Sequence, residues 1–247
     1  MNSFIAELIG TFFLILMGEG VVANVVLNKT KGANSGWMVI TTGWALGVFI
    51  GVVVAGPYSG AHLNPAISIG MAIAGIFPWC NVFYYIIAQL LGAALGATFV
   101  WLIYKDHFEC TENKTSKLGI FCTIPEIKHP LINFIAEIIG TFVLMFVVYY
   151  ITNGEARMTD THTTIPIGLG SVGAIPVSFT VWVIGLSLGG PTGYAITPAR
   201  DLAPRFMHMI LPIKDKGPSN WSYAWIPVVG PIVGSVLASL LFLILKS

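Results

Sequence analysis

Two short segments carry the residue types that could bind or pass a polar solute. Residues 60–70 read GAHLNPAISIG, and residues 193–206 read GYAITPARDLAPRF. In each segment a small polar residue precedes Pro-Ala: Asn64 in the first and Thr197 in the second. Asn and Thr are favourable helix N-caps, and proline suits the first helical turn. Both segments therefore predict the start of a helix, where the backbone amides present a positive partial charge.

The composition places these segments in a membrane. The chain has 247 residues, of which 55% are hydrophobic and 9% are charged, and its mean hydropathy is +0.82. Soluble domains average about 25% charged residues. The apolar runs are long and continuous, which favours an all-α membrane protein over a barrel. A formal net charge of +1 gives no basic field for nucleic acid.

The apolar runs predict six full membrane spans and two half spans. Runs of about 20 residues, the length that crosses a bilayer core, occur at 4–27, 37–56, 81–104, 131–152, 166–189 and 222–245. The segments 65–77 and 198–210 are shorter, and each begins with proline. A short capped helix in such a protein indicates a re-entrant half helix, which must be buried in protein or line a cavity.

The first half of the chain is repeated in the second. Residues 4–12 read FIAELIGTF and residues 134–142 read FIAEIIGTF, and the NPA and TPA segments hold equivalent places. Each copy contains three full spans, so the second copy enters the membrane from the opposite face. Inverted repeats with broken helices place a permeation or binding site near the midplane. We predict one channel domain, 1–247, made of inverted repeats 1–110 and 131–247 and an extramembrane loop, 105–130.

Three acids lie within the predicted spans. Glu7 and Glu137 are repeat partners, and they could relay protons or accept hydrogen bonds from the backbone of the re-entrant loops. The second role is favoured, because two symmetric loops need two symmetric acceptors. Glu19 has no acidic partner in the other repeat and is left unassigned. Arg200 could pair with Asp201, but beside a half-helix cap it is better placed to exclude protons and cations from a pore.

At SGAHLNPA and GYAITPARD, within an inverted three-span repeat, the chain resembles the aquaporin superfamily of major intrinsic proteins over essentially its whole length. Asp201, directly after Arg200, and Pro227, at the start of the last span, are typical of the aquaglyceroporin branch. The resemblance implies a passive channel for glycerol and other small uncharged solutes together with water, closed to ions and protons. Urea and lactic acid are further candidate solutes. It also implies a homotetramer in the plasma membrane.

The resemblance further implies a selectivity filter. Trp44 and Tyr194 match the two filter aromatics of glycerol channels, Arg200 matches the filter arginine, and Gly185 stands where water-selective members carry histidine and would leave room. Each aromatic alone could serve in ordinary packing, but their joint spacing to the two caps favours the filter. Carbonyl groups would form an acceptor ladder in the pore, contributed by Gly60, Ala61, His62, Leu63, Tyr194, Ala195 and Ile196.

Thr197 departs from the family pattern, in which asparagine caps both half helices. Its hydroxyl can accept a hydrogen bond from a half-helix N–H and donate its one proton to a passing oxygen. One donor is lost relative to asparagine. We therefore expect the symmetry of the pore centre to weaken while conduction survives.

The orientation rests on the resemblance, which puts both termini in the cytosol. The distribution of lysines taken alone would put them outside. Asn28 and Asn113 begin N-x-S/T sequons on the side opposite the termini and are candidate glycosylation sites. Cys110 and Cys122 share the 105–130 loop; they could pair on an oxidising side, although two unpaired thiols are favoured.

Other interpretations compete with this one, although a receptor or structural six-span protein would not need two opposed half helices. A water-preferring aquaporin is the main alternative. A secondary transporter also uses inverted repeats and broken helices, but paired acids on a transport path are missing. An enzyme would need a nucleophile or a metal cluster, and the scattered histidines and the motifs of the sequence offer neither. No enzymatic activity, cofactor or metal is therefore expected.

Overall fold

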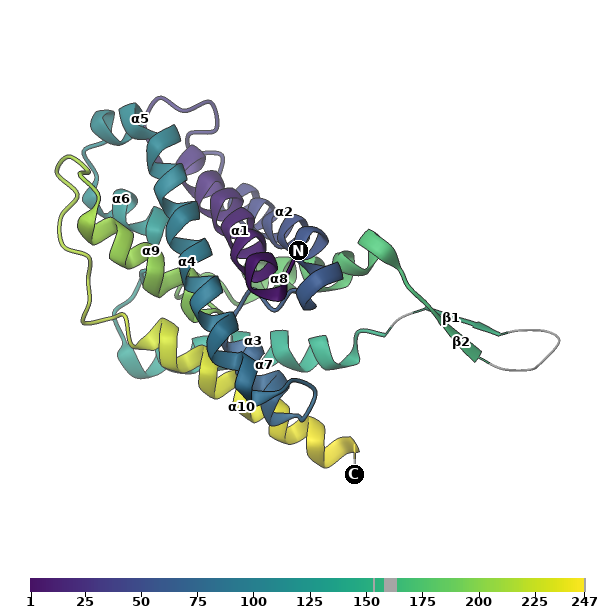
Figure 1. The fold of residues 1–247 in the computed structure, drawn as a ribbon. Helices are drawn as coiled ribbons and strands as arrows, with labels where there is room; N and C mark the ends of the chain where they lie inside the picture. The colour runs from purple at the N-terminus through teal and green to yellow at the C-terminus, as the bar shows by residue number, and fades with distance from the viewer. Residues whose placement is uncertain (153, 158–163, 247) are drawn as a thin grey trace.

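The computed structural model places the helices in one bundle and describes residues 1–152, 154–157 and 164–246 (Figure 1). The long helices are α1 (Ser3–Val26), α2 (Trp37–Ser59), α4 (Trp79–Ile103), α7 (Pro130–Tyr150), α8 (Ile175–Ser187) and α10 (Ile226–Lys246). The short helices are α3 (Pro65–Ile73), α5 (Lys105–Cys110), α6 (Lys114–Phe121), the 3₁₀ helix η1 (Gly170–Ala174) and α9 (Pro198–Ile210). The two short strands are β1 (Gly154–Arg157) and β2 (Thr164–Ile167).

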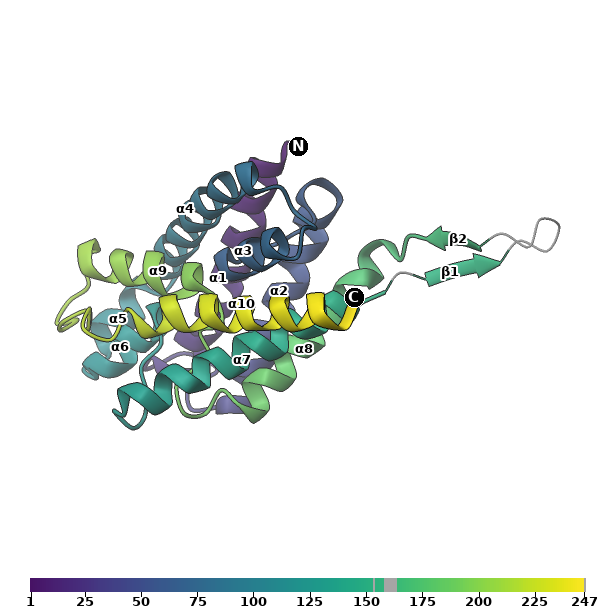
Figure 2. The same ribbon diagram turned by 90° about the horizontal axis from the view of Figure 1, so that it is seen from below.

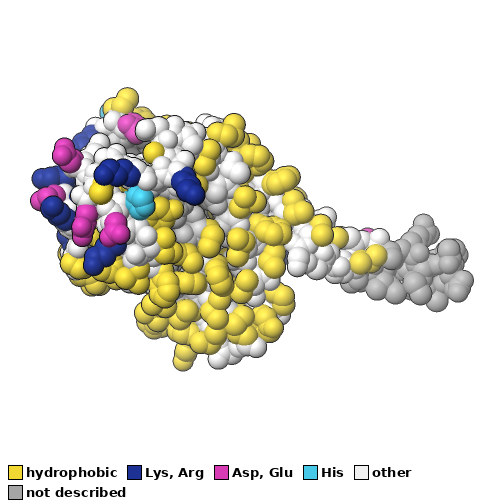
Figure 3. Space-filling view, turned by 90° about the horizontal axis from the view of Figure 1, so that it is seen from above, with side chains coloured by type: hydrophobic (Ala, Val, Ile, Leu, Met, Phe, Trp, Pro, Cys, Tyr) yellow, Lys and Arg dark blue, Asp and Glu magenta, His cyan; other side chains and the backbone are white. Residues whose placement is uncertain are grey.

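Six helices of the described chain are long and apolar enough to cross a membrane, with η1 and α8 counted together over Gly170–Ser187. Large hydrophobic side chains are exposed along them, among them Phe83, Ile103 and Phe179. Figure 3 shows hydrophobic side chains over most of the visible face and charged side chains gathered at the end that carries α5 and α6. An apolar belt bordered by a charged end is the surface of a helical membrane protein.

Two predicted spans begin too early: residues 222–225 form a turn before α10, and the second case is the span over 166–189. The prediction of a span over 166–189 is wrong at its start, because residues 164–167 form β2, which pairs antiparallel with β1 with Gly154 opposite Ile167. The hairpin points away from the helices (Figures 1 and 2). Thr-Ile-Pro-Ile favours extended backbone, since it combines β-branched residues with proline. Helical structure begins only at Gly170, whose φ of +53° marks the change of direction.

Equivalent helices of the two predicted repeats pack in the same way. α1 packs on α4, and α7 packs on α10. The closest approaches occur at glycine: a Cβ on Gly92 would overlap the carbonyl oxygen of Leu8, and a Cβ on Gly234 would overlap that of Ile138. Only a residue without a side chain lets these backbones touch. The same backbone-to-backbone contact therefore occurs in each half of the chain.

The two half helices begin where the sequence predicts, at Pro65 for α3 and Pro198 for α9. Both pack on α4 and α10, and they also contact one another. The residues before them leave the helical region, with Asn64 at φ −155° and Thr197 at φ −149°. Each half helix therefore begins inside the protein, so its first amide groups lie in the interior of the bundle.

Candidate permeation site

Asn64 connects the start of α3 to the loop that leads into α9. Its Oδ1 accepts a hydrogen bond from the amide of Ala66 at 2.9 Å, which caps α3. Its Nδ2 donates to the carbonyl of Ile196 at 2.8 Å, in the loop that leads into α9. One side chain thus satisfies the start of its own helix and fixes the loop before the other, as the two ends of a planar amide can.

Thr197 does not cap α9 with its side chain. Its backbone has the extended geometry of an N-cap residue, but the side chain makes no cap hydrogen bond. Its buried Oγ1 has no hydrogen-bond partner among the described residues. The expectation that this hydroxyl accepts from a half-helix N–H is therefore wrong. A β-branched side chain has few allowed χ1 rotamers, and the one adopted leaves Oγ1 unpaired beside the cavity.

Glu7 binds the loop before α3. Its Oε1 accepts from the amide of His62 at 2.9 Å, and its Oε2 accepts from the amide of Leu63 at 2.7 Å. The side chains of Ser59 and Gln89 also donate to the carboxylate, at 2.6 and 2.8 Å. All four donors bind one fully buried acid. The loop amides therefore have a fixed acceptor and do not need water as a hydrogen-bond partner.

Glu137 does the same for the loop before α9. Its Oε1 accepts from the amide of Ala195 at 3.1 Å and from Thr192 Oγ1 at 2.7 Å. Its Oε2 accepts from the amide of Ile196 at 3.0 Å. The two repeat-related acids thus hold equivalent pairs of backbone N–H groups.

These contacts decide where the loop carbonyls point. In a planar trans peptide the C=O of one residue is antiparallel to the N–H of the next. Because Glu7 binds the amides of residues 62 and 63, the carbonyls of Ala61 and His62 point away from it; the carbonyls of Tyr194 and Ala195 point away from Glu137 for the same reason. All four of these residues line one cavity.

The loops hold this geometry with left-handed backbone at non-glycine residues. φ is +52° at Ala61, +51° at Leu63, +39° at Tyr194 and +44° at Ile196. Such conformations cost of order 1–3 kcal/mol each for residues with a side chain and persist only where their surroundings enforce them. The acids described above supply that enforcement.

Two members of the predicted carbonyl ladder are placed differently. Gly60 ends α2 with φ +80° and does not line the cavity, because its amide closes the last helical turn on Gly56. The carbonyl of Ile196 accepts from Asn64, so one of its two lone pairs is already used. Leu63 lines the cavity as predicted from its place in the loop.

The cavity itself is narrow and opens into a wider one. The volume of the first cavity is about 60 Å³, and that of the second is about 340 Å³. Both cavities are lined by Trp44, Tyr194 and Arg200. The three predicted filter side chains therefore lie together where the narrow cavity meets the wide one.

Two of the filter side chains, Arg200 and Trp44, contact one another through charge and ring surface. The guanidinium carbon of Arg200 lies 4.4 Å from the ring centroid of Trp44, and Nη1 donates to the carbonyl of Phe121 at 3.3 Å. Trp44, Tyr194 and Arg200 are all buried. A cation over an indole face is attracted to it, so Trp44 and the Phe121 carbonyl keep Arg200 at the cavity wall.

Gly185 leaves room, but the room is filled by Tyr194. A Cβ on Gly185 would lie 2.8 Å from Cζ of Tyr194, closer than side chains approach. Gly185 lines neither of the two cavities. The missing side chain lets the tyrosine ring lie against α8, so any effect of Gly185 on the pore acts through Tyr194.

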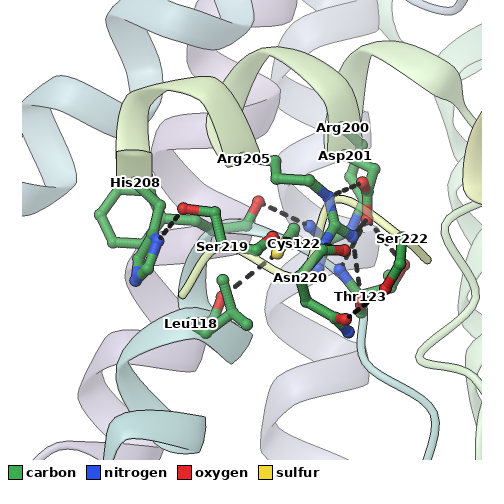
Figure 4. A network of polar contacts seen from close by, with 11 residues as sticks. Leu118, Cys122, Thr123, Arg200, Asp201, Arg205, His208, Ser219, Asn220 and Ser222 are labelled. Atoms are coloured by element: carbon green, nitrogen blue, oxygen red, sulfur yellow. Dashed lines mark hydrogen bonds and ion pairs between the residues drawn. The ribbon is translucent and has the colours of Figure 1, made fainter. Parts of the chain in front are cut away.

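Asp201 pairs with Arg205 rather than with its neighbour Arg200 (Figure 4). Nε and Nη2 of Arg205 donate to the carboxylate at 2.7 and 2.9 Å, and Thr123 donates to it twice at 2.8 Å. Arg205 also donates to the carbonyls of Ser219 and Asn220. The network ties α9 to two loops. Sequence reasoning missed Arg205, although the Asp-to-Arg i,i+4 spacing was the signal for it.

The remaining candidate residues do not line the narrow cavity, although Asn113 and Cys122 line the wide one. Pro227 is the second residue of α10 and is buried. Asn28 and Asn113 are exposed, and the Asn113 side chain caps α6 by accepting from Ser116. Cys110 is an exposed thiol and Cys122 a buried one, and they are not bonded to each other.

Six apolar helices around a buried narrow cavity, with two half helices that begin at it, define a membrane channel. The sequence model described as "Major intrinsic protein" matches residues 1–242. A glycerol uptake facilitator protein of Streptococcus pneumoniae is 51% identical, with 98% of each chain covered, and glycerol uptake facilitator protein 3 of Lactiplantibacillus plantarum is 48% identical, with 98% of this chain and 95% of that one covered.

The fold comparison agrees. The X-ray structure of the aquaglyceroporin from Plasmodium falciparum superposes with a TM-score of 0.80 at 33% identity, covering 97% of this chain and 94% of that chain. This chain belongs to the major intrinsic protein family, and it is an integral membrane protein that crosses the bilayer several times.

Proposed function

We propose that this chain is a passive channel for glycerol and other small uncharged solutes together with water, and that it excludes ions and protons. The observation that carries the proposal is the meeting of Trp44, Tyr194 and Arg200 at the junction of the two cavities. The names of the relatives, which are glycerol uptake facilitators, support it.

The filter suits a polyol because a polyol combines an apolar carbon chain with polar hydroxyl groups. Its carbon atoms would lie on the aromatic rings, and its hydroxyl oxygens would accept hydrogen bonds from Arg200. Its hydroxyl hydrogens would be donated to the carbonyls of Ala61 and His62, which point away from Glu7. Hydration is then replaced step by step along the pore, without one deep minimum that would stop transport.

The same parts disfavour cations. The N-termini of α3 and α9 carry positive partial charge toward the pore centre. Arg200 adds a fixed charge at the narrow end. A cation that loses water there meets the positive potential of Arg200 and of the two helix N-termini, which is the usual means by which water and solute pores exclude protons.

Stopped-flow light scattering on proteoliposomes tests the proposal. Vesicles that hold the purified chain should shrink and then re-swell rapidly in an inward glycerol gradient. Trp44→Ala and Arg200→Ala should both change the glycerol permeability, whereas Trp79→Ala should not, since Trp79 is an exposed tryptophan outside the cavities. Rapid water efflux without glycerol re-swelling would identify a water-preferring aquaporin instead. Urea and lactic acid can be tried in the same assay.

We also propose the arrangement in the membrane: inverted repeats 1–110 and 131–247, cytosolic termini, a homotetramer in the plasma membrane, and glycosylation at Asn28 and Asn113 where a host supplies it. Cys110 and Cys80 are exposed thiols at opposite ends of the α4–α5 segment. A membrane-impermeant maleimide should label Cys110 in intact cells and Cys80 only after the cells are opened. The reverse pattern would place the termini outside.

A further inference from the structure

The ring of Tyr194 is held in the pore wall by packing and not by a hydrogen bond of its own. Its hydroxyl is buried and has no hydrogen-bond partner among the described residues. Its backbone amide donates to Thr192 Oγ1 at 3.3 Å, which constrains the loop but not the side-chain torsions. The position of the ring therefore depends on the residues that contact it.

One side of the ring lies against two glycines at the end of α8. A Cβ on Gly185 would lie 2.8 Å from Cζ of Tyr194. A Cβ on Gly189, just past the end of α8, would overlap Cδ1 of the same ring. The two missing side chains thus form a slot that the tyrosine ring fills, and we call it the glycine slot.

Trp37, the first residue of α2, contacts both the ring and the wall of this slot. The ring centroids of Trp37 and Tyr194 are 5.8 Å apart with an interplanar angle of 80°, an edge-to-face arrangement that aromatic pairs favour. Nε1 of Trp37 donates to the carbonyl of Gly185 at 3.0 Å. That carbonyl lies in the last turn of α8, where the helix supplies no N–H to it. One indole therefore fixes the slot and packs on the ring inside it.

The place of Trp37 relative to the cavities shows which movement it opposes. Trp37 lines the wide cavity and not the narrow one, whereas Tyr194 lines both. Trp37 therefore lies on the wide-cavity side of the filter tyrosine. Without the indole the ring would be free to tilt out of the wall toward the wide cavity, and the passage beside it would widen.

We propose that Trp37 is a positioning residue of the filter: it clamps the Tyr194 ring in the glycine slot and thereby sets the largest polyol that passes. This rests on the proposed function, because it assumes that polyols pass Tyr194. Trp37 acts through Tyr194 and not by lining the narrow cavity itself. The width of the filter is then set by the packing of α2 against α8 as well as by the filter residues.

The proposal predicts changes of opposite sign for two variants. Erythritol has one carbon more than glycerol, so the erythritol-to-glycerol permeability ratio reports the width of the filter. Trp37→Ala frees the ring and should raise this ratio by about three- to tenfold, as expected for the loss of one aromatic contact. Gly189→Ala overfills the slot, pushes the ring into the pore and should lower the ratio.

Two conservative variants separate the ring contact from the hydrogen bond. Trp37→Phe keeps an aromatic ring against Tyr194 but cannot donate to Gly185, and its ratio should stay within about twofold of the wild type. Trp37→Leu fills part of the same space without an aromatic ring, and it should raise the ratio as Trp37→Ala does. If Trp37 only caps the end of α8, the three substitutions at this position should behave alike.

The experiment measures both polyols in the same proteoliposomes by stopped-flow light scattering. Trp221→Ala is the matched control, because Trp221 is 42% exposed, close to the 40% of Trp37, and lines neither cavity. Its ratio should equal that of the wild type. Trp37→Ala is also made in the Tyr194→Ala background, where it should change the ratio no further, since a residue that acts through another has no effect once that partner is removed.

The outcomes separate the inference from the proposed function. Wild-type vesicles without glycerol flux would refute the channel assignment itself. Normal glycerol flux with an unchanged ratio in Trp37→Ala would overturn the clamp, as would the same rise in the Tyr194→Ala background, because Trp37 would then act on the solute directly. Equal rises in Trp37→Ala and Trp37→Phe would also overturn it. If Trp37→Ala does not reconstitute, Trp37→Leu decides: a raised ratio supports the clamp, and a wild-type ratio refutes it.

Discussion

The substitution Glu137→Gln tests whether an acid holds the filter loop in shape. Glu137 accepts from three donors with two oxygens: Ala195 N and Thr192 Oγ1 on Oε1, and Ile196 N on Oε2. Glutamine has the same size, but it replaces one acceptor by an NH₂ group. If its oxygen keeps the position of Oε1, the buried amide of Ile196 faces another donor.

The magnitude follows from those contacts. A buried donor left unpaired costs about 1–3 kcal/mol, and the loss of charge weakens the hydrogen bonds that remain, since charge-assisted bonds are roughly twice as strong as neutral ones. Left-handed backbone at Tyr194 and Ile196 adds to the tendency of the loop to relax. We expect a loss of about 2–4 kcal/mol in the free energy of unfolding.

Two measurements check this expectation. For a chain of this length, about 1 kcal/mol corresponds to roughly 2–4 °C in Tm, so the thermal midpoint in detergent should fall by roughly 4–16 °C. Glycerol permeability should fall as well, because the carbonyls of Tyr194 and Ala195 lose their direction. Glu109→Gln, at an exposed acid of α5, is the control and should change neither. A Tm within about 2 °C of the wild type, with full glycerol flux, would refute the role of Glu137.

Substitutions at three further positions test the cavity and the residues that support it. Thr197→Val removes the unpaired hydroxyl at the cavity and should lower glycerol flux by about fivefold, which corresponds to the free energy of one hydrogen bond. Thr197→Asn should change glycerol flux by less than about tenfold. Light scattering measures both variants, and unchanged flux in the valine variant would show that solutes do not use the hydroxyl. Gly185→Ala should displace Tyr194 and reduce glycerol flux more than water flux, and equal reductions would mean that the ring does not contact the polyol. Arg205→Ala leaves the Asp201 carboxylate buried without its cation and should cost about 3–5 kcal/mol, read as a lower Tm; an unchanged Tm would show that the network does not support the fold.

Most of the architecture could be predicted because the membrane leaves few choices. Continuous apolar runs must be helices, and a short capped run must re-enter. The start of the fifth span was mispredicted because hydropathy does not distinguish the apolar residues of β2 from those of a helix. Residues 164–167 are apolar enough for a span, but they form a strand because β-branched residues and proline favour extended backbone.

The site was less predictable where a side chain has several possible hydrogen-bond or packing partners. The resemblance to the aquaporin superfamily implied that Trp44, Tyr194 and Arg200 lie together, and the structure brings all three to one junction. No spacing rule shows that the Thr197 hydroxyl stays unpaired, or that Tyr194 fills the space beside Gly185. Those outcomes depend on rotamers and on packing between residues distant in the sequence.

The two halves of the chain have equivalent residues where they support the loops and different residues at the positions of Glu19 and Arg200. Glu7 and Glu137 bind equivalent loop amides. The counterpart of Glu19 is Tyr149, whose hydroxyl makes hydrogen bonds to the Gly70 carbonyl and to Ser239. The counterpart of Arg200 is Ile67, which lines the same cavity with an apolar side chain.

Among the described residues that line the narrow cavity, the arginine therefore comes from one half of the chain only. A second arginine in place of Ile67 would put two arginines in one cavity of about 60 Å³. Their mutual repulsion and desolvation would exceed what the surrounding carbonyls offset. The difference between Arg200 and its counterpart Ile67 thus lets a symmetric scaffold hold one oriented hydrogen-bond donor beside two aromatic faces.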